Sequence, residues 1–327
     1  MSSRATAPDD ASEGTVRGRR RRGSTVVFAV AAAAVVLIAG GREYGHTLLW
    51  GYDEDAVAPI TTTAAPKGEK PSLRLAVVGD VGTGDGYEWA TAGRVAEAAS
   101  AGPFDGLILL GDNAYPDGDP ERLADTVFDP FGPVIDAGAA LLAVLGNHDV
   151  AGPGNAEGQV DALGLPGRWY ATDLGGTLFV GLDSTQVGNA RQLAWLESTL
   201  AGSDAATVIV GMHHPAYSAG RHGSTDAVQD LWVPLFRRYG VDLVLAGHDH
   251  DYQRSRPIDG VTYIVTGAAA KIRPTGSDEF TAYSASVRHF LEISVWDGRL
   301  SVTAHNADGP FDHVEIATEG HPAAVGG

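Results

Sequence analysis

Five apolar segments of this sequence end in side chains that can bind metal ions. Each segment is short and nearly free of charge, which is typical of a strand buried on both faces of a sheet. The carboxyl ends of parallel strands meet at one edge of an α/β sheet, so these side chains are expected to lie together. The candidate ligands are Asp80, Asp112, Tyr115, Asn147, His213, His248 and His250.

The stretch from Gly106 to Tyr115, GLILLGDNAY, shows this pattern most clearly. Its apolar run stops at Gly111, and Asp112 follows at once. Taken alone, Gly-Asp-Asn is also good chemistry for an ordinary capped turn. The pattern recurs at four other strand ends, however, and strands that only pack rarely end in His. The recurrence therefore favours a site.

The residue types limit the metal. Carboxylate, amide and phenolate oxygens mixed with imidazole suit iron, manganese or zinc better than calcium or copper(I). Seven ligands are too many for one catalytic ion with an open position, but they fit two ions about 3.5–4 Å apart. Two cations this close need an anion between them, and Asp112 is the natural bridge. The chain has no Cys, which excludes disulfides, iron–sulfur clusters and thiol catalysis.

Strand-like and helix-like segments alternate through most of the chain, which predicts an α/β domain. The candidate strands span residues 73–80, 107–112, 140–149, 177–184, 207–214, 241–250 and 261–269. The candidate helices span 88–100, 121–128, 190–200 and 226–239, and the Gly- and Pro-rich segment 150–167 reads as a loop. A hairpin over 290–305, turning at Asp297-Gly298, indicates that two sheets stack face to face with helices outside.

The N-terminal region differs in composition from the rest. Residues 1–24 hold six Arg and three acidic residues, and residues 25–41 carry no charge. A basic flank before an apolar run predicts a membrane anchor or a secretory signal, with 1–24 as a cytoplasmic tail. Residues 42–71 read as a flexible linker, 72–317 as the catalytic domain and 318–327 as a tail. We therefore expect the domain on the outer side of the cell membrane, or secreted if the segment is cleaved.

Beyond residue 24 the chain carries 17 basic and 38 acidic side chains, a formal charge of −21. A domain this acidic is a poor ligand for nucleic acid, so no nucleic-acid partner is expected. Part of the negative charge is expected to come from ligands that bound cations neutralise.

The order and spacing of the motifs resemble a known family. The series GD…GDNxY…GNHD…VxxH…GHxH is similar to the calcineurin-like metallophosphoesterases, and within them to the purple acid phosphatases of the tartrate-resistant type. Most of that superfamily has His two residues after the first Asp. Here Asp80 is followed by Val81-Gly82, and Tyr115 takes the place of that His, as in the purple enzymes. The resemblance implies two stacked mixed β-sheets flanked by helices, an α/β (α+β) fold of four layers.

The resemblance also implies roles for individual residues. Ferric iron would be held by Asp80, Asp112, Tyr115 and His250. A divalent Fe²⁺, Zn²⁺ or Mn²⁺ ion would be held by Asp112, Asn147, His213 and His248. His148 and His222 match the family's substrate histidines, one of which would protonate the leaving group. Ala114 and His214 stand where the family often has an aromatic residue and a Tyr, and neither is expected to be a ligand.

The implied function is an acid phosphatase that hydrolyses small phosphate monoesters by attack of a metal-bound hydroxide. A phosphodiesterase or nucleotidase on the same scaffold is the second hypothesis, with segments 150–167 and 270–288 framing the substrate. The third is an anchored, non-catalytic metal-binding protein, which would have no need for seven ligands and two further histidines. The catalytic domain is expected to be monomeric.

Other conspicuous residues are expected to be structural. Segment 79–86, GDVGTGDG, lacks the GxGxxG pattern, so its glycines are expected to let the backbone approach the metals. Trp232 and Phe236 lie four apart on a predicted helix and are expected in the core. The remaining histidines are expected to be structural or exposed, namely His289, His305, His313 and His321.

Overall fold

One sheet of six strands has the order β13-β12-β11-β1-β2-β3 in the computed structural model, which describes residues 69–318. The predicted anchor and the two tails lie outside this range, apart from residue 318. Three strands are parallel, namely β1 (Leu73–Val78), β2 (Gly106–Leu110) and β3 (Ala140–Val144). An antiparallel meander extends the sheet through β11 (Phe290–Trp296), β12 (Arg299–Asn306) and β13 (Gly309–Ala317).

The second sheet has seven strands in the order β10-β8-β9-β7-β6-β5-β4. Its parallel centre consists of β5 (Thr177–Gly181), β6 (Thr207–Met212), β7 (Leu243–Ala246) and β9 (Thr262–Thr266). The antiparallel strands are β4 (Tyr170–Asp173), β8 (Tyr252–Ser255) and β10 (Thr281–Ala285). Both sheets are therefore mixed, as predicted.

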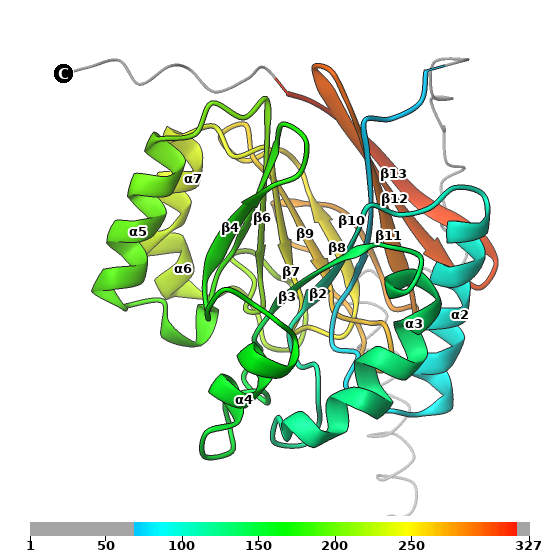
Figure 1. Ribbon diagram of the computed structural model, residues 1–327. Helices are drawn as coiled ribbons and strands as arrows, with labels where there is room; N and C mark the ends of the chain where they lie inside the picture. The colour runs from blue at the N-terminus through cyan, green and yellow to red at the C-terminus, as the bar shows by residue number, and fades with distance from the viewer. Residues whose placement is uncertain (1–68, 319–327) are drawn as a thin grey trace, which may run out of the picture. The chain divides into compact units, whose positions relative to one another are not determined.

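Three clusters of buried apolar side chains define four layers. Alternate residues of β1 point to opposite faces, so Leu75 enters the cluster between the sheets and Ala76 the cluster under the helices. The helices on that side are α2 (Gly86–Ser100) and α3 (Asp129–Ile135), and those on the other are α5 (Ala190–Ala201), α6 (Asp226–Leu231) and α7 (Val233–Arg238). Figure 1 shows the two groups on opposite outer sides. The predicted arrangement is confirmed, and Trp232 and Phe236 are fully buried as expected.

Three predicted segments fold differently from expectation. Segment 150–167 is not a simple loop, because it contains α4 (Asn155–Ala162), which buries Ala156 and Gln159. Gly154 has a left-handed backbone (φ 76°) at the start of this helix. The predicted helix 226–239 is interrupted at Trp232, where Pro234 in the first turn of α7 has no N–H to continue the helix. Segment 121–128 forms 3₁₀ and π-helical turns that lead into α3.

The two sheets are also joined by polar contacts. Arg254 of β8 pairs with Asp312 of β13 (2.6 Å), and the Tyr252 hydroxyl donates to the same carboxylate (2.7 Å).

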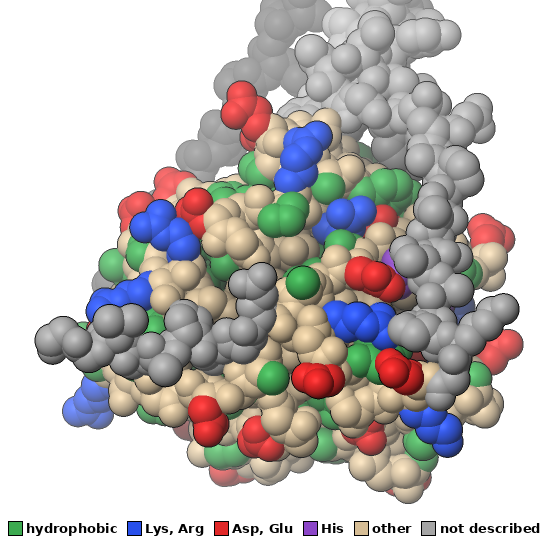
Figure 2. All heavy atoms as spheres, turned by 90° about the horizontal axis from the view of Figure 1, so that it is seen from above, with side chains coloured by type: hydrophobic (Ala, Val, Ile, Leu, Met, Phe, Trp, Pro, Cys, Tyr) green, Lys and Arg blue, Asp and Glu red, His purple; other side chains and the backbone are tan. Residues whose placement is uncertain are grey.

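Figure 2 shows acidic and basic side chains interspersed over the face that lies at the top of Figure 1. No helix among residues 69–318 combines the length and the apolar character that a membrane span requires.

Candidate metal centre

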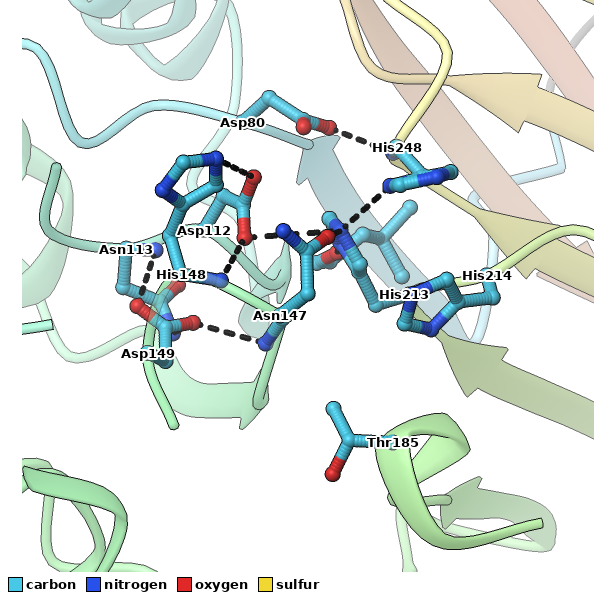
Figure 3. A network of polar contacts seen from close by, with 12 residues as sticks. Asp80, Asp112, Asn113, Asn147, His148, Asp149, Thr185, His213, His214 and His248 are labelled. Atoms are coloured by element: carbon cyan, nitrogen blue, oxygen red, sulfur yellow. Dashed lines mark hydrogen bonds and ion pairs between the residues drawn. The ribbon is translucent and has the colours of Figure 1, made fainter. Parts of the chain in front are cut away.

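The carboxyl ends of parallel strands from both sheets meet at one edge. His213 Nδ1 donates to the carbonyl oxygen of Leu110 (2.8 Å), which joins the end of β6 to the end of β2. The His248 amide donates to Asp80 Oδ2 (2.9 Å), which joins the end of β7 to the end of β1. All seven predicted ligands lie at this junction, and Figure 3 shows the side chains of five of them converging.

Three of the predicted ligands have a left-handed backbone. Asp80, Asp112 and His248 have φ angles of 58°, 53° and 71°, and each lies one Gly beyond the end of its strand. This conformation costs an L-residue about 1 kcal/mol or more and is found mostly at functional sites. The preceding glycines are required by close contacts, since a Cβ on Gly111 would lie 2.7 Å from His213 Nδ1. The turns thus aim all three side chains at the junction.

Asp80, Tyr115 and His250 form one half of the centre. The Tyr115 hydroxyl oxygen lies 3.3 Å from both Asp80 Oδ1 and His250 Nε2, and these two atoms are also 3.3 Å apart. All three residues are buried. Three heteroatoms at this spacing surround a point about 2 Å from each, the usual distance of oxygen and nitrogen ligands from a transition metal.

Asp112, Asn147, His213 and His248 form the other half. His213 Nδ1 donates to a carbonyl, and an imidazole that carries one proton then leaves Nε2 with a free lone pair. This Nε2 atom faces Asn147 Oδ1 at 3.0 Å, Asp112 Oδ1 at 3.5 Å and His248 Nδ1 at 3.2 Å. Nitrogen and oxygen lone pairs that face one another so closely are the arrangement expected around a cation.

Burial shifts four ionisable groups of the centre toward their neutral forms. Burial, and then the adjacent Asp112 carboxylate, raise the pKa of Asp80 well above its usual range. Burial and the carboxylates of Asp80 and Asp112 raise the pKa of the Tyr115 hydroxyl. Burial lowers the pKa of His248 to about 2 and that of His250 to about 3, so both imidazoles are neutral at physiological pH. The donor set and its electrostatics therefore fit the two predicted metal ions.

The two predicted substrate histidines lie at the rim of the centre. The His148 amide donates to Asp112 Oδ1 (3.0 Å), and the His148 side chain is 39% exposed with Nε2 4.0 Å from Asp112 Oδ2. The His222 ring lies 4.3 Å from the His248 ring, and its Nε2 atom accepts a hydrogen bond from Arg273. Both imidazoles thus stand beside a predicted ligand.

Two buried carboxylates that were not among the predicted site residues hold the loops that carry the predicted ligands. Asp149 ties the loops after β2 and β3 together by accepting from the amides of Asn113, Ala114 and Gly146. Asp249 accepts from the His222 amide (2.9 Å) and so fixes the loop that carries this histidine. Both lie inside the motifs GNHD and GHDH, and an acidic residue within a ligand motif is the signal that could have identified them.

Two basic residues from segment 270–288 also reach the centre. Lys271 Nζ lies 3.1 Å from the centroid of the Tyr115 ring. Arg273 donates its backbone amide to the His250 carbonyl (2.8 Å) and its guanidinium to His222. This segment was predicted to frame the substrate, but nothing in the sequence indicates which of its side chains turn inward.

The histidines that were expected to be structural form local contacts. His289 is buried and shares a hydrogen bond with Thr266 (2.8 Å). On the antiparallel part of the first sheet, His313 shares one with Thr303 (2.9 Å) and His305 stacks on Phe290. The fourth, at position 321, lies outside the described residues.

Comparison with protein-family models identifies the family. The model for the calcineurin-like phosphoesterases matches residues 73–252, more than half of the chain. The chain belongs to this family. As a member it is a hydrolase acting on phosphoric esters.

The tartrate-resistant acid phosphatase type 5 of Mus musculus is 28% identical over 289 residues, which cover 76% of this phosphoesterase and 84% of the relative. The Homo sapiens protein of that name is 26% identical over 293 residues, with coverage of 77% and 86%.

Solved structures share the fold of this phosphoesterase. GAP50, described as the anchor in the inner membrane complex of Plasmodium, superposes with a TM-score of 0.68 at 16% identity, covering 77% of this chain and 90% of that one. The purple acid phosphatase PPD1 from yellow lupin seeds gives a TM-score of 0.63 at 19% identity, covering 76% and 55%. At these identities the likeness is one of fold.

Proposed function

We propose that this phosphoesterase is a binuclear metal-dependent acid phosphatase that hydrolyses phosphate monoesters. The observation that carries the proposal is the set of lone pairs around His213 Nε2, where Asn147 and Asp112 oxygens lie at 3.0 and 3.5 Å. A core that only packs would not keep this set, because a buried polar group without a partner costs roughly 1–3 kcal/mol. The tartrate-resistant acid phosphatases among the relatives support the same activity.

The two ions would have ligand sets that share Asp112. The set proposed for Fe³⁺ is completed by Asp80, Tyr115 and His250, because a phenolate is a hard ligand that suits a highly charged ion. The set proposed for Fe²⁺, Zn²⁺ or Mn²⁺ is completed by Asn147, His213 and His248. When bound, such a pair of ions lowers the pKa of water and offsets the charge of the phosphoryl group.

The side chains at the rim would bind and orient the ester. His148 and His222 would donate hydrogen bonds to phosphate oxygens, and one of them would protonate the leaving oxygen. Arg273 contacts His222 and would add a planar, doubly donating cation, which suits a phosphate group. The small ester substrate would thus be held by imidazole and guanidinium donors.

The test compares p-nitrophenyl phosphate with its bis-ester on the metal-loaded protein. We expect faster turnover of the monoester. Asp112→Asn should lose both metals and activity, because a neutral amide cannot hold two cations close together. Asp173→Asn, at an exposed turn where the carboxylate accepts from the Gly175 amide (3.1 Å), is the control and should match the wild type. Full metal content and activity in Asp112→Asn would refute the binuclear centre, and faster hydrolysis of the diester would favour a phosphodiesterase instead.

We also propose that residues 25–41 tether the domain to the outer face of the cell membrane. The support is the basic segment 1–24 followed by an uncharged apolar run. Protease added to intact cells should remove the domain while a cytoplasmic control protein survives. Protection of the domain would contradict this orientation, and protein recovered from the medium without residues 1–41 would identify a cleaved signal.

A further inference from the structure

His214 follows the predicted ligand His213 in the chain. It lies beside His248, in the half of the centre to which both of these residues belong (Figure 3). Its ring centroid is 5.0 Å from that of His213 and 4.5 Å from that of His248. Ring nitrogens of the three histidines lie within 4.8 Å of one another, close enough to hold one ion together. Distance alone is therefore compatible with two roles for His214, a third imidazole ligand or a hydrogen-bond donor to the bound substrate.

The hydrogen bonds of Ser184 distinguish these roles. Ser184 Oγ lies 3.2 Å from the His213 amide and 2.8 Å from the His214 amide, and both amides are donors. A hydroxyl group offers two lone pairs and one proton. The amides use both lone pairs, so the hydroxyl proton is donated to the third neighbour, His214 Nδ1 at 2.9 Å.

This count determines the tautomer of His214. Nδ1 accepts a hydrogen bond, and a neutral imidazole carries one proton, so that proton is on Nε2. A metal ligand must offer an unprotonated nitrogen, whereas Nδ1 is occupied and Nε2 is protonated. His214 Nε2 makes no hydrogen bond within residues 69–318 and is not one of the buried polar atoms without a partner there. It is therefore a donor open to solvent.

Ser184 is buried and is held in place by the turn that it opens. It opens a 3₁₀ turn, Ser184–Gln186, that follows the end of β5 and is marked by Thr185 in Figure 3. The fully buried Asp183 accepts from the Thr185 amide (3.0 Å) and from Arg168 Nε (2.8 Å). The position of the hydroxyl, and with it the tautomer of His214, is thus built into the fold.

We infer that His214 donates a hydrogen bond from Nε2 to an oxygen of the bound phosphate group and is not a metal ligand. The inference rests on the proposed phosphatase function and adds a third imidazole to those of His148 and His222. A monoester has three non-bridging oxygens and a diester only two, so a further imidazole donor at this site favours a monoester. His214 is therefore a specificity residue for terminal phosphate groups.

The test uses the zinc-loaded protein with inorganic phosphate as the probe, and metal content is measured in every variant. His214→Leu removes the donor and should weaken phosphate binding on the order of ten- to hundredfold, with metal content unchanged. His214→Gln places an amide N–H near the position of Nε2 and should recover most of the affinity. His313→Leu is the matched control, because this histidine also bonds a hydroxyl group but lies on β13, and it should bind phosphate as the wild type does.

Two results would overturn the inference. One is loss of a metal ion in His214→Leu, which would identify a ligand, and the other is unchanged phosphate affinity in that variant. A ¹⁵N–¹H NMR spectrum of the zinc-loaded protein tests the tautomer independently of phosphate binding. A proton on His214 Nε2 supports the inference, and a proton on Nδ1 contradicts it. Failure of the proposed function would appear in the wild type instead, as absence of the metal pair or of monoester hydrolysis.

Discussion

Replacing Asp149 by Asn perturbs the buried frame that holds the predicted metal ligands in place. Asp149 is fully buried and accepts five hydrogen bonds, three at Oδ1 and two at Oδ2. The donors at Oδ2 are the Gly146 amide (2.8 Å) and the side-chain amide of Asn113 (3.1 Å). Asn has nearly the same shape but only one carbonyl oxygen, so its NH₂ group would face at least two N–H donors that lose their acceptor.

The magnitude follows from these two donors. A buried donor without a partner costs roughly 1–3 kcal/mol, so the two together cost about 2–6 kcal/mol of unfolding free energy. Burial and the Asp112 carboxylate raise the pKa of Asp149 to about 6, which means that they destabilise its charged form. Replacing the carboxylate by a neutral amide removes this unfavourable interaction and offsets part of the loss. We therefore expect a value in the lower half of the range.

Guanidinium chloride unfolding of the metal-loaded protein measures this loss. Asp173→Asn removes a carboxylate oxygen from an exposed turn and serves as the control, with a change expected within about 0.5 kcal/mol. A loss below about 1 kcal/mol in Asp149→Asn would refute the reasoning, because the loops after β2 and β3 would then not depend on this carboxylate.

Three further predictions concern two other residues of the centre and one residue outside it. Gly146→Ala should lower the metal content found after dialysis, because a Cβ there would lie 2.2 Å from Asp112 Oδ1; wild-type metal content would contradict this. Tyr115→Phe should abolish the visible charge-transfer band and weaken retention of ferric iron, and a variant still coloured at full iron loading would show that the phenolate is not a ligand. Asp242 lies at the amino end of β7, where burial raises its pKa from 3.8 to about 6. Between these two pH values the native state keeps a proton that the unfolded chain has released. The free energy of unfolding therefore falls as pH rises through this window. Asp242→Asn should remove that slope in urea unfolding and add on the order of 1–3 kcal/mol at pH 7, and an unchanged slope would argue against it.

The fold and the convergence of the candidate ligands were predictable wherever the signal is local. An apolar run, then Gly, then a polar residue marks the ends of β1, β2 and β7, and these are the places where Asp80, Asp112 and His248 adopt the left-handed turn. Buried parallel strands must be apolar on both faces, so their ends are visible in the sequence. The alternation of strands and helices then indicated which edge the ligands share.

The remaining features depend on contacts between distant segments. The edge strands β4 and β10 include exposed or half-exposed residues, so no apolar run marks them, and they are defined by pairing with β5 and β8. Arg273 turns inward because its backbone amide bonds the His250 carbonyl, which no local pattern encodes. The donor state of His214 depends on a hydroxyl thirty positions earlier in the chain, at Ser184.

The most direct test of the binuclear centre is metal analysis of the purified protein together with its visible spectrum. We expect about two metal ions per chain, at least one of them iron. The oxidised protein should be purple to pink, because the Tyr115 phenolate would be bound to Fe³⁺. A fully active protein that holds a single metal ion per chain would contradict the binuclear centre.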